Sequence, residues 1–392
     1  MANVSSSNGI EKYPKLRFQG YRDKWSEICF RDLFSYIPNN TLSRAELNYE
    51  SGEYKNVHYG DVLIKYGPVL DASAEEIPFI NEYKEGKVDY LLRDGDIIIA
   101  DTAEDETVGK ATEIINIGEQ KIVSGLHTIA CHPTIEIAHT YLGFYINSEK
   151  YHRQLYSLMQ GVKVLSISKS NIEGTVIRYP SSSEQKKICT LLNLLQNRIV
   201  KQQKTIELLK KYKRGVLRKV FDDICCSYYK SPLENLCVSI SSGKTTSVND
   251  CGKCPLIGST GPIGYTDFEE FNEELVLVAR VGANAGAVNY YAGACGVTDN
   301  TLVVRVDKAH CNPKYILYFL EYYDPHRLIF GSGQPLVTGG QLKKIEVPII
   351  SKDKQEKVVE LFSLLNRYCT CAQEQLDSLI CEKKALLQQL FI

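Results

Sequence analysis

Two stretches of the chain carry apolar residues at alternating steps of four and three positions. This spacing lines one face of a helix and is typical of a two-stranded coiled coil. The first stretch ends at Phe221 and the second at Phe391. The positions predicted to form the seam are Ile188, Leu192, Leu195, Ile199, Ile206, Leu209, Val216, Val220, Val358, Phe362, Leu365, Leu376, Leu379, Leu386 and Leu390.

The second stretch repeats the first at a displacement of 170 positions. Ile188 is therefore equivalent to Val358, and the polar interruption Lys213 is equivalent to Lys383. Pro180 precedes the first stretch, and the serines after it with Glu184 and Gln185 predict a capping box. We expect two helices of roughly 38 residues, or about 57 Å each at 1.5 Å per residue. A helix in the core of a bundle is the alternative, but the average globular helix has only about 11 residues.

A mixed region of strands and short helices precedes each long helix. In the second half we predict strands at 275–281, 287–291 and 301–306, a turn at 282–286, and a helix at 313–323. The first half offers strands at 96–101 and 108–115 and a helix at 141–146. Tyr141 precedes Tyr315 by 174 positions, so the repeat extends into these regions while the loops differ. The predicted fold class is α+β, with two mixed α/β domains and two long helices.

Composition is that of an ordinary globular protein, with 44% hydrophobic and 24% charged residues in a chain of 392. No apolar run is long enough to predict a membrane span. The polar start, residues 1–9, lacks the pattern of a signal peptide, so we expect a flexible tail and a cytoplasmic protein.

Charge is distributed unevenly between the two helices. Residues 181–221 contain eleven Lys or Arg and two acids, a net charge of +9, whereas residues 351–392 contain six of each sign, a net charge of 0. The first helix therefore offers a basic face suited to phosphates or to an acidic partner, although a solvated face is the simpler alternative.

The thirteen cysteines do not predict a metal site, because most stand singly among apolar neighbours and Cys251 and Cys254 form one isolated Cys-x-x-Cys. Gly243, Lys244 and Thr245 look like the end of a phosphate-binding loop, but Val238 occupies the position of the required first glycine. Residues 330–333 follow a helical segment instead of a strand, and the acids at 101–106 read as a solvated turn. We expect no active site and no metal.

The layout resembles the specificity subunit of type I restriction-modification systems. The resemblance covers nearly the whole chain and is carried by motifs that are individually modest but occur in order and in duplicate. These motifs lie at 94–100, 184–185, 240–246, 258–265, 279–286 and 331–342.

The resemblance implies a non-catalytic DNA reader. Residues 13–180 and 226–348 would be target-recognition domains, and residues 181–225 and 349–392 would be antiparallel spacer helices that relate the domains by a pseudo-twofold axis; residues 1–12 would be the tail. Each domain would read one half of a bipartite double-stranded target, with the halves about 34 Å apart.

The resemblance also implies the partners. Two modification (methyltransferase) subunits would dock around the helices, and restriction (translocase/nuclease) subunits would complete the complex. S-adenosylmethionine, ATP and Mg would then belong to those partners, with no cofactor in this chain.

Residues expected to contact DNA are polar or basic positions in predicted loops and strand ends, where direct readout and phosphate contacts are made. In the first domain they are Lys55, His58, Lys65, Tyr66, Lys163, Ser168, Lys169 and Asn171. In the second they are Lys244, Thr245, Ser259, Thr260, Tyr265, Arg280, Asn284, Gln334, Thr338 and Lys343. Two other classes remain open: a coiled-coil adaptor that does not bind DNA, and a stand-alone DNA methyltransferase or nuclease.

Overall fold

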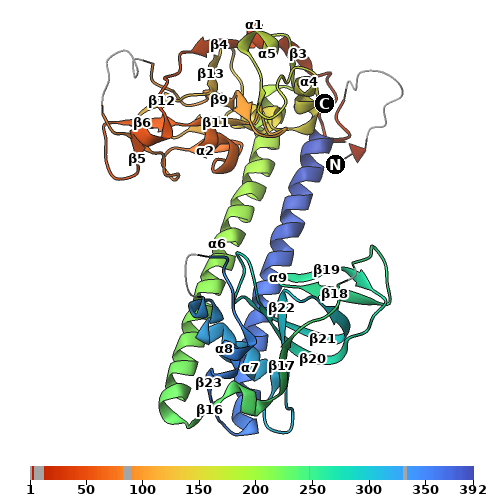
Figure 1. Cartoon of the computed structure of the whole chain (residues 1–392). Coiled ribbons are helices and arrows are strands. Elements are labelled where there is room, and N and C mark those ends of the chain that lie inside the picture. The colour runs from red at the N-terminus through yellow and green to blue at the C-terminus, as the bar shows by residue number, and fades with distance from the viewer. Residues whose placement is uncertain (1, 4–12, 83–89, 247, 330–332) are drawn as a thin grey trace. The chain divides into compact units, whose positions relative to one another are not determined.

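The computed structural model of the chain describes residues 2–3, 13–82, 90–246, 248–329 and 333–392. The chain forms two compact units, each with a mixed α/β domain and a part of both long helices (Figure 1). Unit 1 comprises Met1–Lys201 and Leu376–Ile392, and unit 2 comprises Gln202–Gln375. The predicted tail at 1–12 lies outside the described residues except for Ala2 and Asn3, which form strand β1.

Helix α6 spans Ser182–Ser227 and helix α9 spans Lys352–Leu390, which confirms the two predicted long helices. The predicted length holds for α9, with 39 residues, but α6 has 46. The helix continues past Gly215, where a side chain would meet open space. The capping box predicted at the start of α6 gave Glu184 the wrong hydrogen-bond partner. Both carboxylate oxygens of Glu184 accept hydrogen bonds from the guanidinium of Arg17, each at 2.8 Å, and both side chains are buried.

Unit 1 is built on two sheets. The five-stranded sheet has the order β4, β13, β9, β11, β7, and the four-stranded sheet has the order β12, β6, β8, β5. In those orders the strands are Phe34–Ile37, Thr128–Pro133, Ile97–Ala100, Ala111–Ile115 and Val69–Asp71, then Lys121–Ser124, Tyr54–Val57, Phe79–Ile80 and Leu47–Asn48.

Short helices and strand pairs complete unit 1. Strand β15 (Val176–Tyr179) pairs with β3 (Ser26–Cys29), β10 (Thr102–Ala103) with β14 (Leu165–Ser166), and β1 with β2 (Leu16–Arg17). The helices are α1 (Phe30–Leu33), α2 (Tyr59–Ile64), α3 (Tyr141–Ile146), α4 (Glu149–Tyr156) and α5 (Lys169–Ile172), with a 3₁₀ turn at Arg44–Glu46. Helix α3 has the predicted bounds.

Unit 2 is built on one six-stranded sheet with the order β17, β22, β20, β21, β18, β19. In that order the strands are Cys237–Ser242, Thr301–Val306, Phe271–Ala279, Val288–Val297, Cys254–Gly258 and Gly261–Thr266. Strand β16 (Lys230–Pro232) pairs with β23 (Glu346–Pro348). The remaining elements are α7 (Pro313–Tyr323), α8 (Gly339–Lys343) and 3₁₀ turns at Leu233–Leu236 and Pro325–Leu328. Strand β22 and helix α7 have the predicted bounds, whereas β20 begins earlier and β21 ends later than expected.

The predicted seam positions are all buried or half-buried. In unit 1 the first turns of α6 and the last turn of α9 share one core, which contains Ile188, Leu192 and Leu390. In unit 2 the last turns of α6 meet the first turns of α9 through Phe221 and Phe362. Within each unit the two helices therefore run antiparallel.

A buried glutamine fixes the start of α6 to the domain of unit 1. Gln185 is 2% exposed; its Oε1 accepts from the backbone N–H of Ala138 at 2.8 Å, and its Nε2 donates to the Pro180 carbonyl at 2.9 Å. Beside it, the hydroxyl of Tyr141 donates to the Arg178 carbonyl at 2.9 Å. These bonds satisfy backbone groups that burial would otherwise leave without a partner.

Unit 2 repeats this joint, with the glutamine displaced by 170 positions and the tyrosine by 174. Gln355 is 3% exposed; it accepts from the N–H of Asn312 at 2.8 Å and donates to the Ile350 carbonyl at 3.0 Å. The hydroxyl of Tyr315 donates to the Pro348 carbonyl at 2.9 Å. The duplication thus preserves individual hydrogen bonds as well as the helical pattern.

The two terminal phenylalanines close the joints in the same way. The ring of Phe391 lies 5.7 Å from that of Tyr141, and the ring of Phe221 lies 5.7 Å from that of Tyr315.

Among the described residues, no helix has the length and apolar character needed to cross a membrane.

Candidate functional site

Two of the DNA-contact candidates in unit 1, His58 and Tyr66, are built into the domain. His58 is 8% exposed, and its Nδ1 accepts from the N–H of Gly60, so the ring caps helix α2. Burial lowers the pKa of His58 below its ordinary value. Tyr66 is 1% exposed, and its hydroxyl donates to the Glu76 carbonyl at 3.3 Å. Neither side chain is available to a duplex, so we withdraw both as contact residues.

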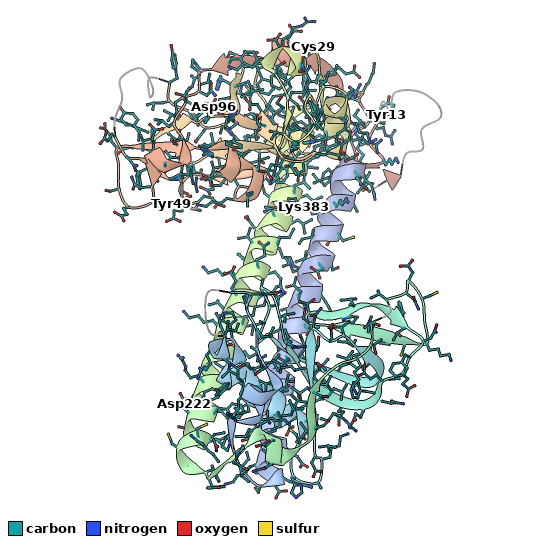
Figure 2. All side chains as sticks on the ribbon, viewed as in Figure 1. Tyr13, Cys29, Tyr49, Asp96, Asp222 and Lys383 are labelled. Carbon is teal, nitrogen blue, oxygen red and sulfur yellow. The ribbon has the colours of Figure 1, made fainter. Side chains whose placement is uncertain are left out.

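Lys55 and Lys65 lie near that buried pair with their ammonium groups engaged. Lys55 donates to the side chain of Gln120 at 2.7 Å. Lys65 donates to the Glu76 carbonyl at 2.5 Å, and its Nζ lies 4.8 Å from the ring of Tyr49, which is labelled in Figure 2. Both lysines are partly exposed, and each could exchange its acceptor for a phosphate.

The other four candidates of unit 1 lie after helix α4. Lys163 and Lys169 are exposed, and the ammonium of Lys169 lies 5.4 Å from the centre of the Tyr36 ring. Ser168 is the N-cap of α5 and accepts from the N–H of Asn171. Asn171 in turn donates to a backbone carbonyl at 3.2 Å. Lys163 and Lys169 are therefore the two members of this group best placed to meet DNA.

In unit 2 the loop that follows β20 is joined to the turn before β22. The backbone N–H of Arg280 donates to the Asn300 carbonyl at 2.8 Å, and its guanidinium donates to the Asp299 carbonyl at 3.2 Å. Arg280 is half-buried, so part of the guanidinium still faces solvent. Asn284, at the tip of the same loop, is exposed.

A third segment, 333–338, lies against this loop. The N–H of Val337 donates to the Arg280 carbonyl at 2.8 Å, and the N–H of Gly282 donates to the Pro335 carbonyl at 3.1 Å. The structure therefore brings Arg280, Asn284 and Gln334 onto adjoining loops, although they are up to 54 positions apart in sequence. Gln334 is exposed, but the earlier part of its predicted motif, residues 330–332, lies outside the described residues.

Thr338 and Lys343 belong to the short helix α8. Thr338 is its N-cap and forms a capping box with Gln341. It stands 170 positions after Ser168, the cap of α5, so these two candidates are equivalent and have the same structural role. Lys343 is half-buried in the last turn of α8.

The segment after β17 positions Lys244 for contact but buries Thr245. Thr245 is 4% exposed, and its hydroxyl donates to the carboxylate of Glu270 at 2.8 Å. The same carboxylate accepts from the backbone N–H of Lys244 at 3.0 Å. We therefore withdraw Thr245 and keep Lys244, whose side chain is exposed.

The β18–β19 hairpin forms the outer edge of the sheet and carries Ser259, Thr260 and Tyr265. Asn289 of β21 donates to the Ser259 carbonyl at 3.2 Å, which ties the turn to the sheet. Thr260 is exposed, and Tyr265 is 46% exposed. An exposed aromatic side chain on a hairpin could stack or donate a hydrogen bond. Sequence reasoning missed Asn289 and Glu270, which hold these loops, because their partners are distant in sequence.

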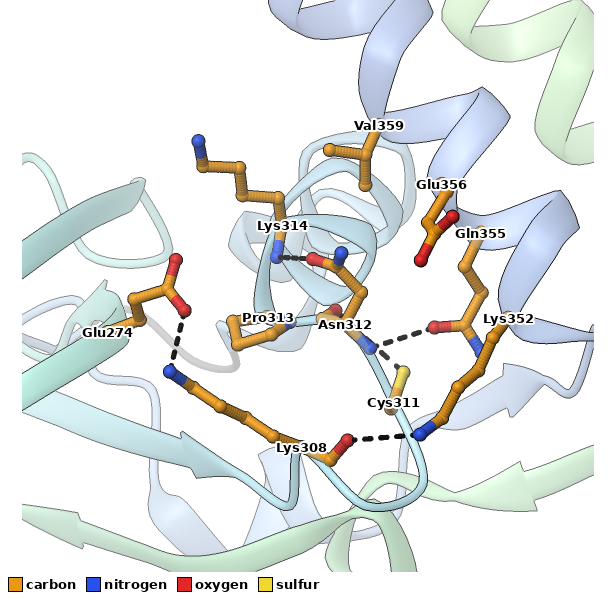
Figure 3. Close-up of a pocket in the computed structure, with 10 residues that line it drawn as sticks. All are labelled: Glu274, Lys308, Cys311, Asn312, Pro313, Lys314, Lys352, Gln355, Glu356 and Val359. Carbon is orange, nitrogen blue, oxygen red and sulfur yellow. Dashed lines mark hydrogen bonds and ion pairs between the residues drawn. The ribbon is translucent and has the colours of Figure 1, made fainter.

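A cavity of about 380 Å³ lies beside the joint of unit 2 (Figure 3). Lys308 lines it and pairs with Glu274 at 2.7 Å, and Gln355 crosses it to reach Asn312. Lys314 and Lys352 also line this cavity. Within the ranges that the structure describes, no three His, Cys, Asp or Glu side chains gather as metal ligands would.

Half-buried His132 and buried Asp96 form an acid–base pair in unit 1. The Nδ1 of His132 lies 2.5 Å from a carboxylate oxygen of Asp96, whose other oxygen accepts from the N–H of Arg93 at 2.7 Å. Burial raises the pKa of Asp96. Asp96 is completely buried, so a substrate could not reach its carboxylate, and the pair holds the strand ends together.

Comparison with known families gives one match that covers most of the chain. The model of the type I restriction modification DNA specificity domain matches residues 22–210 and again residues 230–380. The family match is itself duplicated, in agreement with the repeat.

Relatives and solved structures agree with this match. A putative specificity subunit of the type I restriction enzyme MjaX from Methanocaldococcus jannaschii is 19% identical, over 97% of this chain and 96% of the relative. The N-terminal part of a putative type I specificity subunit from Mycoplasma pneumoniae is 28% identical over 29% of this chain and 63% of the relative. The S subunit structure from M. genitalium has a TM-score of 0.62 at 15% identity and covers 97% of this chain and 99% of its own. A structure from a study of type I R-M complex assembly and conformational transition has a TM-score of 0.55 at 16% identity, covering 94% and 97%.

Proposed function

We propose that this chain, which belongs to the type I restriction modification DNA specificity family, recognises DNA through two separate readers, one in each α/β domain. Its role is DNA recognition within a restriction-modification complex, and the family is non-catalytic. The proposal concerns how the chain divides that recognition: residues 13–180 would read one half of a split target and residues 226–348 the other.

The observation that carries the proposal is a repeated joint that holds unlike loops. Gln185 and Gln355 make equivalent hydrogen bonds, as do Tyr141 and Tyr315. The exposed candidates differ between the units. Unit 1 offers Lys163 and Lys169, whereas unit 2 offers one lysine, Lys244, together with Thr260, Tyr265, Asn284 and Gln334. Amide side chains read base edges and lysines bind phosphates, so the same frame can present different specificities.

The long helices would set the separation between the two half-sites. A helix rises about 1.5 Å per residue and is stiff over this length, so its residue count can fix a spacing. The basic positions of α6, such as Arg198, Lys204 and Lys210, are exposed and available to phosphates or to an acidic partner surface.

We further propose two modification subunits and, in the full complex, restriction subunits as partners, in a bacterial or archaeal cytoplasm. Adenine methylation would then use S-adenosylmethionine on the modification subunits, and ATP and Mg would act on the restriction subunits. This chain would determine which DNA sequence is modified and would supply no reacting group.

The test is to express the chain with its modification subunits in a host without DNA methylation and to sequence the modified adenines. We expect one bipartite motif with a fixed spacer. A continuous motif would contradict the two readers, and the absence of any methylated motif would favour an adaptor that does not bind DNA.

The spacer can be tested in the same assay. The side chain of Gln202 donates to the Ala372 carbonyl at 2.8 Å, so positions near 203 in α6 and 373 in α9 lie at one level of the helix pair. Inserting four residues at both positions adds about one turn to each helix and keeps the seam paired. The permitted spacer should change while both half-sites stay the same. Methylation that persists with the original spacer would contradict the proposal that the long helices set the spacer.

A further inference from the structure

Unit 1 contains a cavity of about 480 Å³ that two lysines from distant parts of the chain share. Lys383 reaches it from α9 and Lys110 from the loop before β11, and His152 of α4 and Gln196 of α6 also line it. Lys383 is labelled in Figure 2. All of these residues belong to unit 1.

Each ammonium group in the cavity has one neutral acceptor. Lys383 Nζ donates to Gln196 Oε1 at 2.6 Å, and Lys110 Nζ donates to the Leu63 carbonyl at 2.5 Å. An ammonium has three donors, and a buried charge without a counter-charge is costly. Across the described ranges, neither lysine forms an ion pair. Burial, with a smaller contribution from the charge of Lys110, lowers the pKa of Lys383 to about 8, and burial lowers the pKa of Lys110.

The equivalent lysine of unit 2 is paired with a carboxylate. Lys213 stands 170 positions before Lys383, and its ammonium pairs with Glu321 of α7 at 2.9 Å. The displacement of 174 that relates Tyr141 to Tyr315 places Asn147 at the position of Glu321. Asn147 is neutral, and its side chain donates to two backbone carbonyls, so it offers Lys383 no charge.

The acids at the rim of the cavity do not replace that carboxylate. Glu149 is held by Arg153 at 3.3 Å and by the hydroxyl of Tyr156 at 3.4 Å. Glu106 lies in an exposed loop. The repeated position therefore has a carboxylate in unit 2 and the neutral Asn147 in unit 1, where it lines the same cavity as Lys110 and Lys383.

We propose that the cavity of unit 1 binds a phosphate group, with Lys110 and Lys383 as its cationic partners and His152 as a further donor. A phosphate carries up to two negative charges and several acceptor oxygens, which matches two ammonium groups with unused donors. The phosphate could belong to a small molecule or to a nucleic-acid backbone, and the recognition chemistry is the same.

The test uses the full chain and titrates inorganic phosphate by calorimetry at constant ionic strength, with chloride as the reference anion. We expect saturable binding to one site. The decisive variant is Gln196→Glu, which converts the acceptor 2.6 Å from Lys383 into a carboxylate of the same shape. It should weaken phosphate binding at least tenfold, and Lys383→Met should do the same.

Matched controls separate the site from general charge effects. Gln203→Glu makes the same change on an exposed position of α6, and Lys213→Met removes the equivalent lysine of unit 2. Both should leave phosphate binding within twofold of the original chain. Failure of the original chain to prefer phosphate over chloride, or equal losses in Gln196→Glu and Gln203→Glu, would overturn the proposal.

Competition then identifies the source of the phosphate. If adenosine monophosphate displaces inorganic phosphate and a duplex of unrelated sequence does not, the ligand is a small molecule. If the duplex displaces it, the site holds the DNA backbone. Either assignment requires that the competitor also bind this site more weakly in the Gln196→Glu variant.

Discussion

Units 1 and 2 hold the long helices by equivalent hydrogen bonds, yet they present different loops and give one repeated lysine different partners. Gln185 and Gln355 are both buried and both bridge a backbone N–H and a carbonyl. In contrast, Lys213 pairs with the carboxylate of Glu321, whereas Lys383 donates to the neutral Gln196 and lies 5.8 Å from the centre of the Phe144 ring. The buried glutamines at the helix starts are therefore the same in both units, whereas the partner of the repeated lysine and the exposed loops differ.

The physical reason lies in the cost of each kind of change. Leaving a buried backbone group without a partner costs about 1–3 kcal/mol, whereas surface substitutions usually change stability by less than about 0.5 kcal/mol. Loops such as 280–287 can therefore acquire a new specificity while the joint stays the same.

The largest effect should come from breaking either joint. Gln355→Leu would leave the Asn312 N–H and the Ile350 carbonyl without partners, so we expect the free energy of unfolding of unit 2 to fall by about 2–5 kcal/mol. Gln185→Leu should destabilise unit 1 equally, and exposed Gln203→Leu should be nearly neutral. Urea unfolding of the full chain measures all three. A loss in only one unit would show that the joints are not equivalent.

The pH dependence of stability should distinguish the units. The carboxylates buried among the described residues, Asp61, Asp96, Glu113 and Glu184, all belong to unit 1. Burial raises the pKa of Glu113 to about 7 from an unfolded value of about 4.5. Folded unit 1 therefore holds a proton that the unfolded chain has released, so stability falls as pH rises from about 4.5 to 7, by about 3 kcal/mol at most.

The variant Glu113→Gln isolates this contribution. Its amide cannot ionise, so the decline across that window should flatten, although one backbone N–H would lose its acceptor and unit 1 would be weaker at low pH. Thermal unfolding between pH 4.5 and 7 is the measurement. An unchanged slope would mean that Glu113 is ionised in the folded chain throughout.

A smaller and symmetrical effect should follow from trimming the terminal rings. Phe391→Leu and Phe221→Leu each remove ring atoms from a buried aromatic cluster, and we expect each to lower stability by about 1–2 kcal/mol. Equal losses in unit 1 and unit 2 would extend the equivalence of the joints to their apolar contacts. A difference greater than about 2 kcal/mol would limit it to the hydrogen bonds.

The smallest change in stability, with an effect confined to one half of the target, should come from the loops of unit 2. Asn284→Ala and Gln334→Ala alter exposed side chains, so unfolding should shift by less than about 0.5 kcal/mol. Loss of a base contact would weaken target binding by about 1–3 kcal/mol. Asn272→Ala, exposed at the other end of β20, is the control. Binding to targets mutated in either half would reveal which half is affected.

The helical pattern was the most reliable guide to the fold. Apolar periodicity identified both long helices and helix α7, and the structure adds that Asn312 caps the start of α7. The β18–β19 hairpin was missed because its residues, rich in glycine and lacking strict alternation, give no clear strand signal. The predicted capping box was wrong because the carboxylate of Glu184 accepts a hydrogen bond from Arg17, which lies 167 positions away in the sequence.

The candidate site was harder to predict, because exposure depends on tertiary packing. Ser168 and Thr338 look like loop residues that could contact DNA, but they cap short helices. Thr245 is polar and lies in a loop, yet it is buried against Glu270. The sequence singled out Gln185 only as part of a helix entry and did not single out Gln355. Each glutamine bonds to a backbone N–H about 45 positions away, and no local pattern predicts that contact.

The most direct test of the two-reader account is exchange of residues 228–348 for the equivalent segment of another family member, followed by sequencing of methylated adenines in cells that contain the modification subunits. We predict that one half of the target changes while the other half and the spacer stay the same. Methylation in which both halves change together, or neither changes, would contradict the claim that each domain reads its own half.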